Sequence, residues 1–312
     1  MWRLNFYDTR IDFLGKGKLA MILSAVVLLV CLGALLVRGL NLGLDFTGGT
    51  AVEVRYLDPV EVPQIRETLA AAGFGDAQVQ HFGTSRDVLI RIPPRDQLDA
   101  AMLSNQVLEV LRAADGGAGV TLARAEFVGP QVGQELAEQG GLAALGAMIG
   151  ILIYIIFRFE WRLALGTIAA TIHDVIFTVG WFALFQIEFD LTVLAAVLAV
   201  IGYSVNDSVV VLDRIRENFR KRRKGSTLEI MNLSINETLT RTIVTSLSTL
   251  MAVLVLLFLG GAVMHGFSIA LLIGVLVGTY STIYIASATA LYLGVGREDL
   301  LPRPKETADE RP

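Results

Sequence analysis

The chain has 312 residues and a formal net charge of −4; 54% of its residues are hydrophobic and 18% are charged. Its mean hydropathy is +0.59. This composition excludes an ordinary water-soluble globular protein and is typical of an integral membrane protein with one modest polar domain. Because the chain has a single cysteine, Cys31, it cannot form an intrachain disulfide.

Six apolar stretches are long enough to cross a hydrocarbon layer about 30 Å thick as helices. They are Leu19–Val37, Leu142–Phe157, Leu163–Phe185, Leu191–Leu212, Ile243–Leu259 and Phe267–Leu293. The first stretch follows basic residues, as the core of a signal peptide would, but it is long and no small-residue cleavage site precedes Arg38. We therefore expect a retained membrane helix.

The distribution of basic residues predicts the orientation of these helices. Lys and Arg concentrate at the N-terminus, at Arg158–Arg162, at Arg214–Lys224 and in the C-terminal tail. The intervening turns at Gln186–Asp190 and Gly260–Gly266 contain neither. The positive-inside rule then places both termini in the cytoplasm, and residues 39–138 in the periplasm or its equivalent. We call residues 39–138 the outer domain.

The outer domain has the pattern of a small α+β fold. Alternation predicts strands at Gly49–Leu57, Ala77–Phe82, Val88–Ile92 and Val120–Phe127, and apolar spacing predicts helices at Pro59–Ala72 and Gln97–Ala114. The order β-α-β-β-α-β is the ferredoxin-like arrangement. The predicted fold class is an α-helical membrane protein with six transmembrane helices and a ferredoxin-like domain between the first two.

The predicted organisation has five parts. They are a cytoplasmic N-terminus (1–18), a first transmembrane helix (19–38), the outer domain (39–138), a five-helix transmembrane domain (139–294) and a disordered cytoplasmic tail (295–312). Within the fourth part, residues 213–241 form a basic and amphipathic cytoplasmic segment. Ser226 and Glu229 have capping-box spacing there, which predicts a short helix lying along the membrane surface.

Asp207 lies inside the fourth apolar stretch, where a charge costs about 3 kcal/mol on insertion-based scales. Such a residue normally faces a bundle interior, where it binds a partner, an ion or a proton. A carboxylate is costly to ionise there and is stabilised by a nearby cation, so it can load and release protons if its surroundings switch. The structural alternative is a residue that joins two helices by hydrogen bonds. Helical spacing places Ser204 beside Asp207 as a hydrogen-bonding neighbour.

Arg241 and Asp174 are the other ionisable residues at membrane depth. Arg241 opens the fifth stretch at a depth similar to that of Asp207, so it either pairs with Asp207 or extends to the interface. Asp174, preceded by His173, lies nearer the middle of its stretch. Because neighbouring helical residues point about 100° apart, we do not expect these two to form a relay pair. Depth alone does not rank Asp174 below Asp207.

A glycine-containing motif follows the first stretch. It includes Asp45, Phe46, Gly48 and Gly49, and its glycines permit positive φ, which predicts a tight turn into a strand. No P-loop, dinucleotide fingerprint, catalytic triad pattern or metal-ligand spacing appears in the sequence. We therefore expect neither an enzyme nor a cofactor.

Four segments resemble the SecD/SecF family of the bacterial Sec protein-export machinery, and its SecF branch in particular. They are residues 45–49, 201–218, 237–246 and 278–287. The resemblance extends from Trp2 to about Leu293. Ser208 stands where the family more often has Thr, and Ala288 where Pro is common. Neither difference removes an ionisable group.

The resemblance implies one half of a twelve-span complex of the RND superfamily in the bacterial inner membrane, with SecD as obligate partner. Such complexes use the proton motive force to assist export of unfolded preproteins through SecYEG; YajC and a membrane insertase are further expected partners, and nucleic acid is not. Asp207 and Arg241 correspond to the family's proton-pathway aspartate and essential arginine. Secondary candidates are Asp174, His173, Ser204 and Asn206. The residues do not distinguish protons from sodium as the coupling ion.

Two other functions remain open on the sequence. In a passive assembly or stabilising subunit of the translocon, the ionisable residues would only hold helices together, and an Asp207→Asn variant would be tolerated. An RND-type exporter of small molecules or lipids would be expected to carry a larger outer domain than the roughly 100 residues present here.

Overall fold

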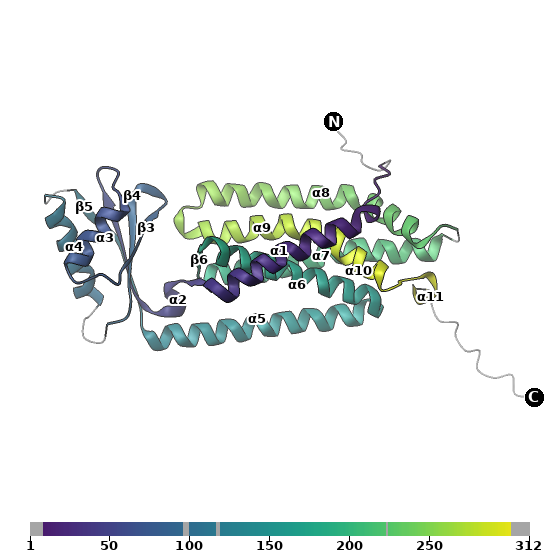
Figure 1. Cartoon of the computed structure of the whole chain (residues 1–312), viewed down its shortest axis with the longest axis horizontal. Helices are drawn as coiled ribbons and strands as arrows, with labels where there is room; N and C mark the ends of the chain where they lie inside the picture. The colour runs from purple at the N-terminus through teal and green to yellow at the C-terminus, as the bar shows by residue number, and fades with distance from the viewer. Residues whose placement is uncertain (1–8, 96–99, 117–118, 223, 301–312) are drawn as a thin grey trace, which may run out of the picture.

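The computed structural model describes residues 9–95, 100–116, 119–222 and 224–300. The part of the predicted tail from residue 301 onward, like residues 1–8 of the predicted N-terminus, lies outside the described residues. Figure 1 shows a bundle of long helices with a small α+β domain at one end. The first residues of α1 and the short α11 (Arg297–Leu300) both lie at the opposite end.

The described residues contain six helical spans that are long and apolar enough to cross a membrane, as the sequence predicts. Five are single helices: α1 (Gly17–Arg38), α5 (Pro130–Arg158), α6 (Trp161–Phe185), α7 (Leu191–Lys221) and α8 (Thr227–Leu259). The sixth is composite, because α9 (His265–Ser281) continues through a π-helical segment, η3 (Thr282–Ala286), into α10 (Ser287–Tyr292). Five of the six contain the whole apolar stretch that identifies them, and the sixth ends at Tyr292, one residue before its predicted end, so the α-helical membrane fold class is confirmed.

The outer domain contains a four-stranded antiparallel sheet and two helices. Its elements in chain order are β2 (Gly49–Tyr56), α3 (Val62–Ala71), β3 (Gln78–Phe82), β4 (Thr84–Ile92), α4 (Ala100–Ala114) and β5 (Val120–Val128). The strand order is β3-β4-β2-β5. Alternate residues of the central strands, such as Val52, Val54 and Ile90, are fully buried with Leu69 and Val107 of the helices. The helices cover the side of the sheet that faces away from the bundle (Figure 1), so its other face is turned toward the membrane helices.

Short elements join the two parts. β1 (Asn41–Leu42) pairs in parallel with β6 (Glu188–Phe189), and α2 (Leu44–Thr47) leads from β1 into β2. A single 3-10 turn, η2 (Ala262–Met264), connects α8 to α9. Elements this short carry no periodicity, so the sequence does not predict them.

The prediction of a separate surface helix within residues 213–241 is wrong. Ser226 does cap a helix with a full capping box, but that helix is α8, which runs without interruption to Leu259. Its apolar residues Met231, Ile235 and Leu239 are buried in the main core of the bundle rather than against lipid. The helix continues because no Gly or Pro interrupts it between residues 227 and 259. Similarly, α5 begins at Pro130, before the predicted domain boundary at residue 138.

Candidate functional site

Asp207 is buried in α7 and faces α8. Its side chain is 6% exposed, and Thr242 Oγ1 donates a hydrogen bond of 3.0 Å to Asp207 Oδ1. Within the described part of the chain, Oδ2 of Asp207 has no hydrogen-bond partner. A buried carboxylate oxygen without a donor is costly when the group is ionised, and it accommodates a proton when the group is neutral.

The neighbourhood of Asp207 includes the π-helical segment of the sixth span. The hydroxyl oxygen of Ser208, the next residue in α7, lies 3.0 Å from Thr282 Oγ1, and the two form a hydrogen bond. Thr282 is the first residue of η3, and its carbonyl oxygen accepts a hydrogen bond of 3.2 Å from Ser287 Oγ. Single π-helical turns are rare and are found frequently at functional sites. The ionisable residue of α7 therefore lies beside an irregular turn of the helix packed against it.

Arg241 precedes Thr242 in α8 but points to a different side of that helix. It is exposed and lines an open cleft of about 760 Å³ together with Asn206, Asp213 and Glu237. Within the described residues, the side-chain partner of Asp207 is Thr242 and no ion pair joins it to Arg241, although Arg241 is close enough to act on that carboxylate electrostatically. The pairing of the two therefore stays a prediction.

Asp174 is completely buried, and its side chain has three polar partners. Ser204 Oγ and Ser281 Oγ donate to Oδ2 at 2.5 and 2.7 Å. His173 Nδ1 lies 2.9 Å from Oδ1. These contacts connect α6 to α7 and α9, and they satisfy both oxygens of the carboxylate.

Two expectations about these residues are wrong. Ser204 donates to Asp174 and not to Asp207, because it lies on the face of α7 that packs against α6 and α9. His173 and Asp174 do interact, although they are adjacent in one helix. The divergence of about 100° applies to Cα–Cβ directions, and a long imidazole can turn back toward a neighbouring carboxylate.

The motif at residues 45–49 makes the joint between α1, the outer domain and α7. Asp45 Oδ2 accepts a hydrogen bond of 3.0 Å from the backbone N–H of Leu191, the first residue of α7. The ring of Phe46 stacks on that of Phe189, with centroids 6.2 Å apart. Gly48 and Gly49 have φ of +66° and +122°, and a Cβ at Gly49 would lie 2.4 Å from the carbonyl oxygen of Ile92. The predicted tight turn into a strand is therefore confirmed.

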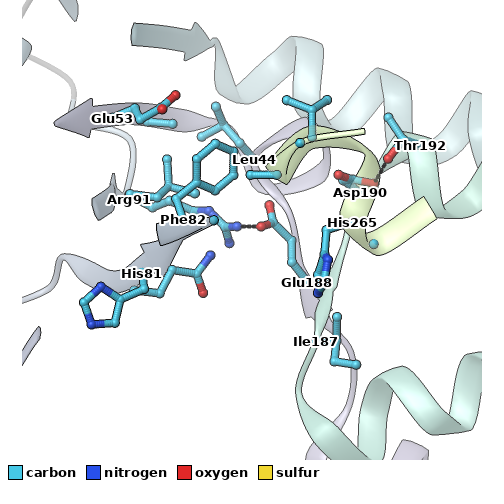
Figure 2. Close-up of a pocket in the computed structure, with 18 of the residues that line it drawn as sticks. Leu44, Glu53, His81, Phe82, Arg91, Ile187, Glu188, Asp190, Thr192 and His265 are labelled. Carbon is cyan, nitrogen blue, oxygen red and sulfur yellow. Dashed lines mark hydrogen bonds and ion pairs between the residues drawn. The ribbon is translucent and has the colours of Figure 1, made fainter. Parts of the chain in front are cut away.

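A cavity of about 920 Å³ separates the sheet of the outer domain from the near end of the bundle (Figure 2). One wall is the open face of the sheet, with Glu53, Phe82 and Arg91, and the other includes Ile187 and Glu188 of the segment between α6 and α7. Arg91 forms an ion pair with Glu188 across it. Sequence reasoning missed this pair because nothing local connects residues so far apart in the chain.

Among the residues described, no group of three or more His, Cys, Asp or Glu side chains is arranged to hold a metal ion.

Comparison with known proteins identifies the family. The family described as protein export membrane protein SecD/SecF, C-terminal, matches residues 107–296, and the SecD/SecF GG motif matches residues 33–59. The protein translocase subunit SecF of Pseudomonas aeruginosa is 49% identical over 99% of this chain and 100% of its own length. That of Vibrio alginolyticus is 50% identical over 97% of this chain and 96% of its own.

A solved structure agrees with these sequence matches. The crystal structure of SecDF, a translocon-associated membrane protein from Thermus thermophilus, superposes with a TM-score of 0.83 at 38% identity. The match covers 94% of this chain but only 39% of the SecDF chain. The chain is a multi-pass membrane protein that belongs to the SecF family of protein translocase subunits, within the SecD/SecF protein export membrane proteins.

Proposed function

We propose that the chain is the SecF subunit of a SecD–SecF complex, which uses the proton motive force to assist export of unfolded preproteins through SecYEG and their release on the periplasmic side. Its role is transport rather than catalysis. The match to 39% of the SecDF chain supports a partner, because the remainder of that chain would correspond to a separate SecD subunit here. YajC and a membrane insertase are further expected partners.

The proposed orientation has both termini in the cytoplasm of a bacterium and the outer domain in the periplasm. α5 ends at Arg158 and α7 ends at Lys221, within the basic segment Arg214–Lys224, and these helix ends point away from the outer domain (Figure 1), which agrees with the positive-inside rule. The turn between α6 and α7, beside the outer domain, has no basic residue.

The proposal depends chiefly on the difference between the two buried acids. Both oxygens of Asp174 have polar partners, from residues of three helices, so the hydrogen-bonding capacity of this carboxyl group is satisfied. Asp207 accepts one hydrogen bond, from Thr242, and its Oδ2 has no hydrogen-bond partner within the described residues; Thr282 is the one further hydroxyl described there that is close enough to interact with this carboxylate. A group that is incompletely stabilised in either protonation state is the better proton carrier, because a small change in its surroundings changes which state it prefers.

In the proposed cycle, Asp207 alternates between a protonated form and an ionised form paired with Arg241. Thr242 contacts Asp207 while the adjacent Arg241 faces the cleft, so a shift of α8 together with a new rotamer of the long Arg241 side chain would bring the guanidinium to the carboxylate. That shift would disturb the packing of α7 and η3 and change how the span packs against SecD. Sodium coupling would use the same carboxylate, and the residues of the site do not distinguish the two ions.

The test is pulse-chase export of a secreted precursor in cells depleted of their own SecF. Asp207→Asn should accumulate precursor as the empty vector does, because Asn keeps the shape but does not titrate. Asp174→Asn is the matched control, and it should retain at least part of the export activity. Both variants must first reach wild-type levels in the membrane and co-purify with SecD.

Normal export by Asp207→Asn would overturn the proposal and favour a passive assembly subunit, in which bulky apolar replacements of Asp207 unfold the bundle while Asn is tolerated. Loss of export with Asp174→Asn alone would transfer the proton-carrying role to Asp174. An RND-type exporter of small molecules or lipids would leave precursor export unchanged in every variant.

A further inference from the structure

Arg91 is a buried cation in an unusual position. It lies on the open face of the sheet, in the central strand β4, opposite Ala51 of β2 and Gln78 of β3. It is only 9% exposed, although no helix of the outer domain covers that face. Its burial comes from the segment between α6 and α7, which carries Glu188 (Figure 2).

Three carboxylates of the bundle side surround this guanidinium. Glu188 forms an ion pair with it, and Asp190 and Asp45 act on it electrostatically. Burial lowers the pKa of Arg91, while the negative charges of Asp190 and Asp45 oppose that effect. Without Arg91, the carboxylate of Glu188 would lose its ion-pair partner in a partly desolvated site that also feels the negative charges of Asp45 and Asp190, which is unfavourable.

The same acids hold the start of α7. Asp190 is the N-cap of that helix and accepts a hydrogen bond of 2.8 Å from the Val193 N–H, while Asp45 accepts one from the Leu191 N–H. α7 then runs unbroken past Asp207, which lies about 24 Å further along at 1.5 Å per residue. The end of the helix that contacts the outer domain is therefore rigidly connected to the carboxylate of the proposed proton site.

We propose that Asp45, Arg91, Glu188 and Asp190 form an electrostatic joint, the outer joint, through which movement of α7 is passed to the outer domain, with Arg91 as its positioning residue. This inference rests on the proposed function, because it supplies the connection between the proton site and the periplasmic movement. Among the described residues, the outer joint is the only connection that combines an ion pair with the sheet, Arg91 to Glu188, and carboxylates that cap the first N–H groups of α7. The β3–β4 turn also comes near the α8–α9 connection across the gap, where a Cβ built on Gly83 would lie 3.6 Å from Ala262 Cβ, and neither of these two residues is charged.

The test is charge reversal in the full chain together with SecD. Arg91→Glu and Glu188→Arg should each lower the rate of precursor export about tenfold or more, because either change replaces the ion pair by two like charges in a partly desolvated site. The double variant restores opposite charges at the pair and should regain at least part of the export rate. Arg95→Glu is the matched control, because Arg95 forms an exposed ion pair of 2.7 Å with Asp76 in the same domain. It should export as the wild type does.

A distance measurement separates a joint from mere stabilisation. Spin labels at the exposed positions Arg86 and Val263 report the separation of the outer domain from the bundle, and the buried Cys31 does not compete for the label. In proteoliposomes containing the complex, this distance should change with the proton gradient in the wild type and in Arg95→Glu. In Arg91→Glu it should no longer respond, although the outer domain still resists protease.

Asp207→Asn is measured in parallel so that the two proposals fail separately. If Asp207→Asn blocks export while Arg91→Glu exports at the wild-type rate, the outer joint is disproved and the proposed function stands. The outer joint is also disproved if both single variants lose export and the double variant recovers none of it. It is likewise disproved if the distance between the spin labels still changes with the proton gradient in Arg91→Glu. If Asp207→Asn exports normally, the proposed function itself is wrong.

Discussion

The outer domain and the membrane bundle place their residues in opposite ways. In the outer domain the interior is apolar, with Val52, Val54 and Leu69 fully buried. In the bundle many large apolar residues are on the outside, and Leu36 and Phe157 are each 87% exposed. The bundle interior instead includes buried hydroxyl and carboxylate side chains, among them Thr167, Asp174, Ser204, Ser208, Ser246 and Ser281.

The difference follows from the solvent that each part meets. Water expels apolar side chains from the surface of the outer domain, whereas lipid tails solvate them as well as a protein core would. Polar groups in the bundle therefore collect inside, where they bind one another. It follows that the outer domain depends on apolar packing for stability, while the specific polar contacts of the bundle determine which helix faces meet and where a proton can reside.

The largest expected effect comes from deleting apolar volume on the two sides of this comparison. Leu69→Ala leaves a cavity in the core of the outer domain and should destabilise it by about 2–5 kcal/mol. Leu36→Ala removes the same atoms from a lipid-facing position and should change bundle stability by less than about 0.5 kcal/mol. Hydrogen exchange of β2 and β4 measures the first, and unfolding of the purified complex in SDS measures the second. Equal losses would contradict the comparison.

A smaller effect tests the polar interior of the bundle. Ser246 Oγ lies 3.0 Å from Tyr203 Oη, which donates to it, and 2.7 Å from Thr279 Oγ1, so hydroxyl groups of three helices meet there. Ser246→Ala should cost about 0.6–1.7 kcal/mol, which are the average and the largest values for a hydrogen bond between membrane helices. Thr245→Val is the matched control on the adjacent, exposed position, since Thr245 donates only to carbonyl oxygens of its own helix. SDS unfolding should distinguish the two, and an equal cost would mean that the hydroxyl chain contributes nothing.

Sequence patterns predict the two parts unequally for the same physical reason. The alternation of Val52, Val54 and Tyr56 identifies a strand because one face of the sheet is apolar and the other is not. In the bundle the apolar pattern shows where helices span but not which way they face, since lipid and interior are both apolar. The position of Asp174 and Asp207 within apolar stretches therefore identifies both as unusual. It does not reveal that Ser281, 107 residues further along the chain, donates a hydrogen bond to Asp174.

The outer joint and the π-helical segment were also beyond sequence reasoning. From the sequence, Arg91 is expected to be an ordinary exposed residue of a strand. Its burial follows only from the segment that carries Glu188, which lies over it in the structure. Thr282 lies in an unbroken apolar stretch with no Gly or Pro at the position where the helix widens. Both features arise from packing between distant segments, and no local pattern encodes them.

The smallest expected effect concerns the charged surface of the outer domain. Asp87 accepts a hydrogen bond of 2.5 Å from Arg55 Nε and one of 2.7 Å from Thr84 Oγ1. The Arg55 contact lowers the pKa of Asp87 below its ordinary value, and Thr84 adds to this while burial opposes it. Because the folded pKa is the lower one, Asp87 stabilises the domain above the pKa of an unfolded aspartate, about 4, and this contribution is lost as the pH falls through the folded value.

The measurement is the hydrogen-exchange protection factor of β4 between pH 6 and pH 3 in the full chain, corrected for intrinsic exchange. Protection should fall toward low pH in the wild type, and Arg55→Gln should lower it near pH 6 while making it less dependent on pH. The change should be small, since Arg55 is well exposed and water screens the pair. An Arg55→Gln profile parallel to the wild-type profile would show that Thr84 alone holds Asp87. In that case the positive charge of Arg55 contributes nothing measurable to the stability of the outer domain, which depends on apolar packing and on neutral hydrogen bonds such as that of Thr84.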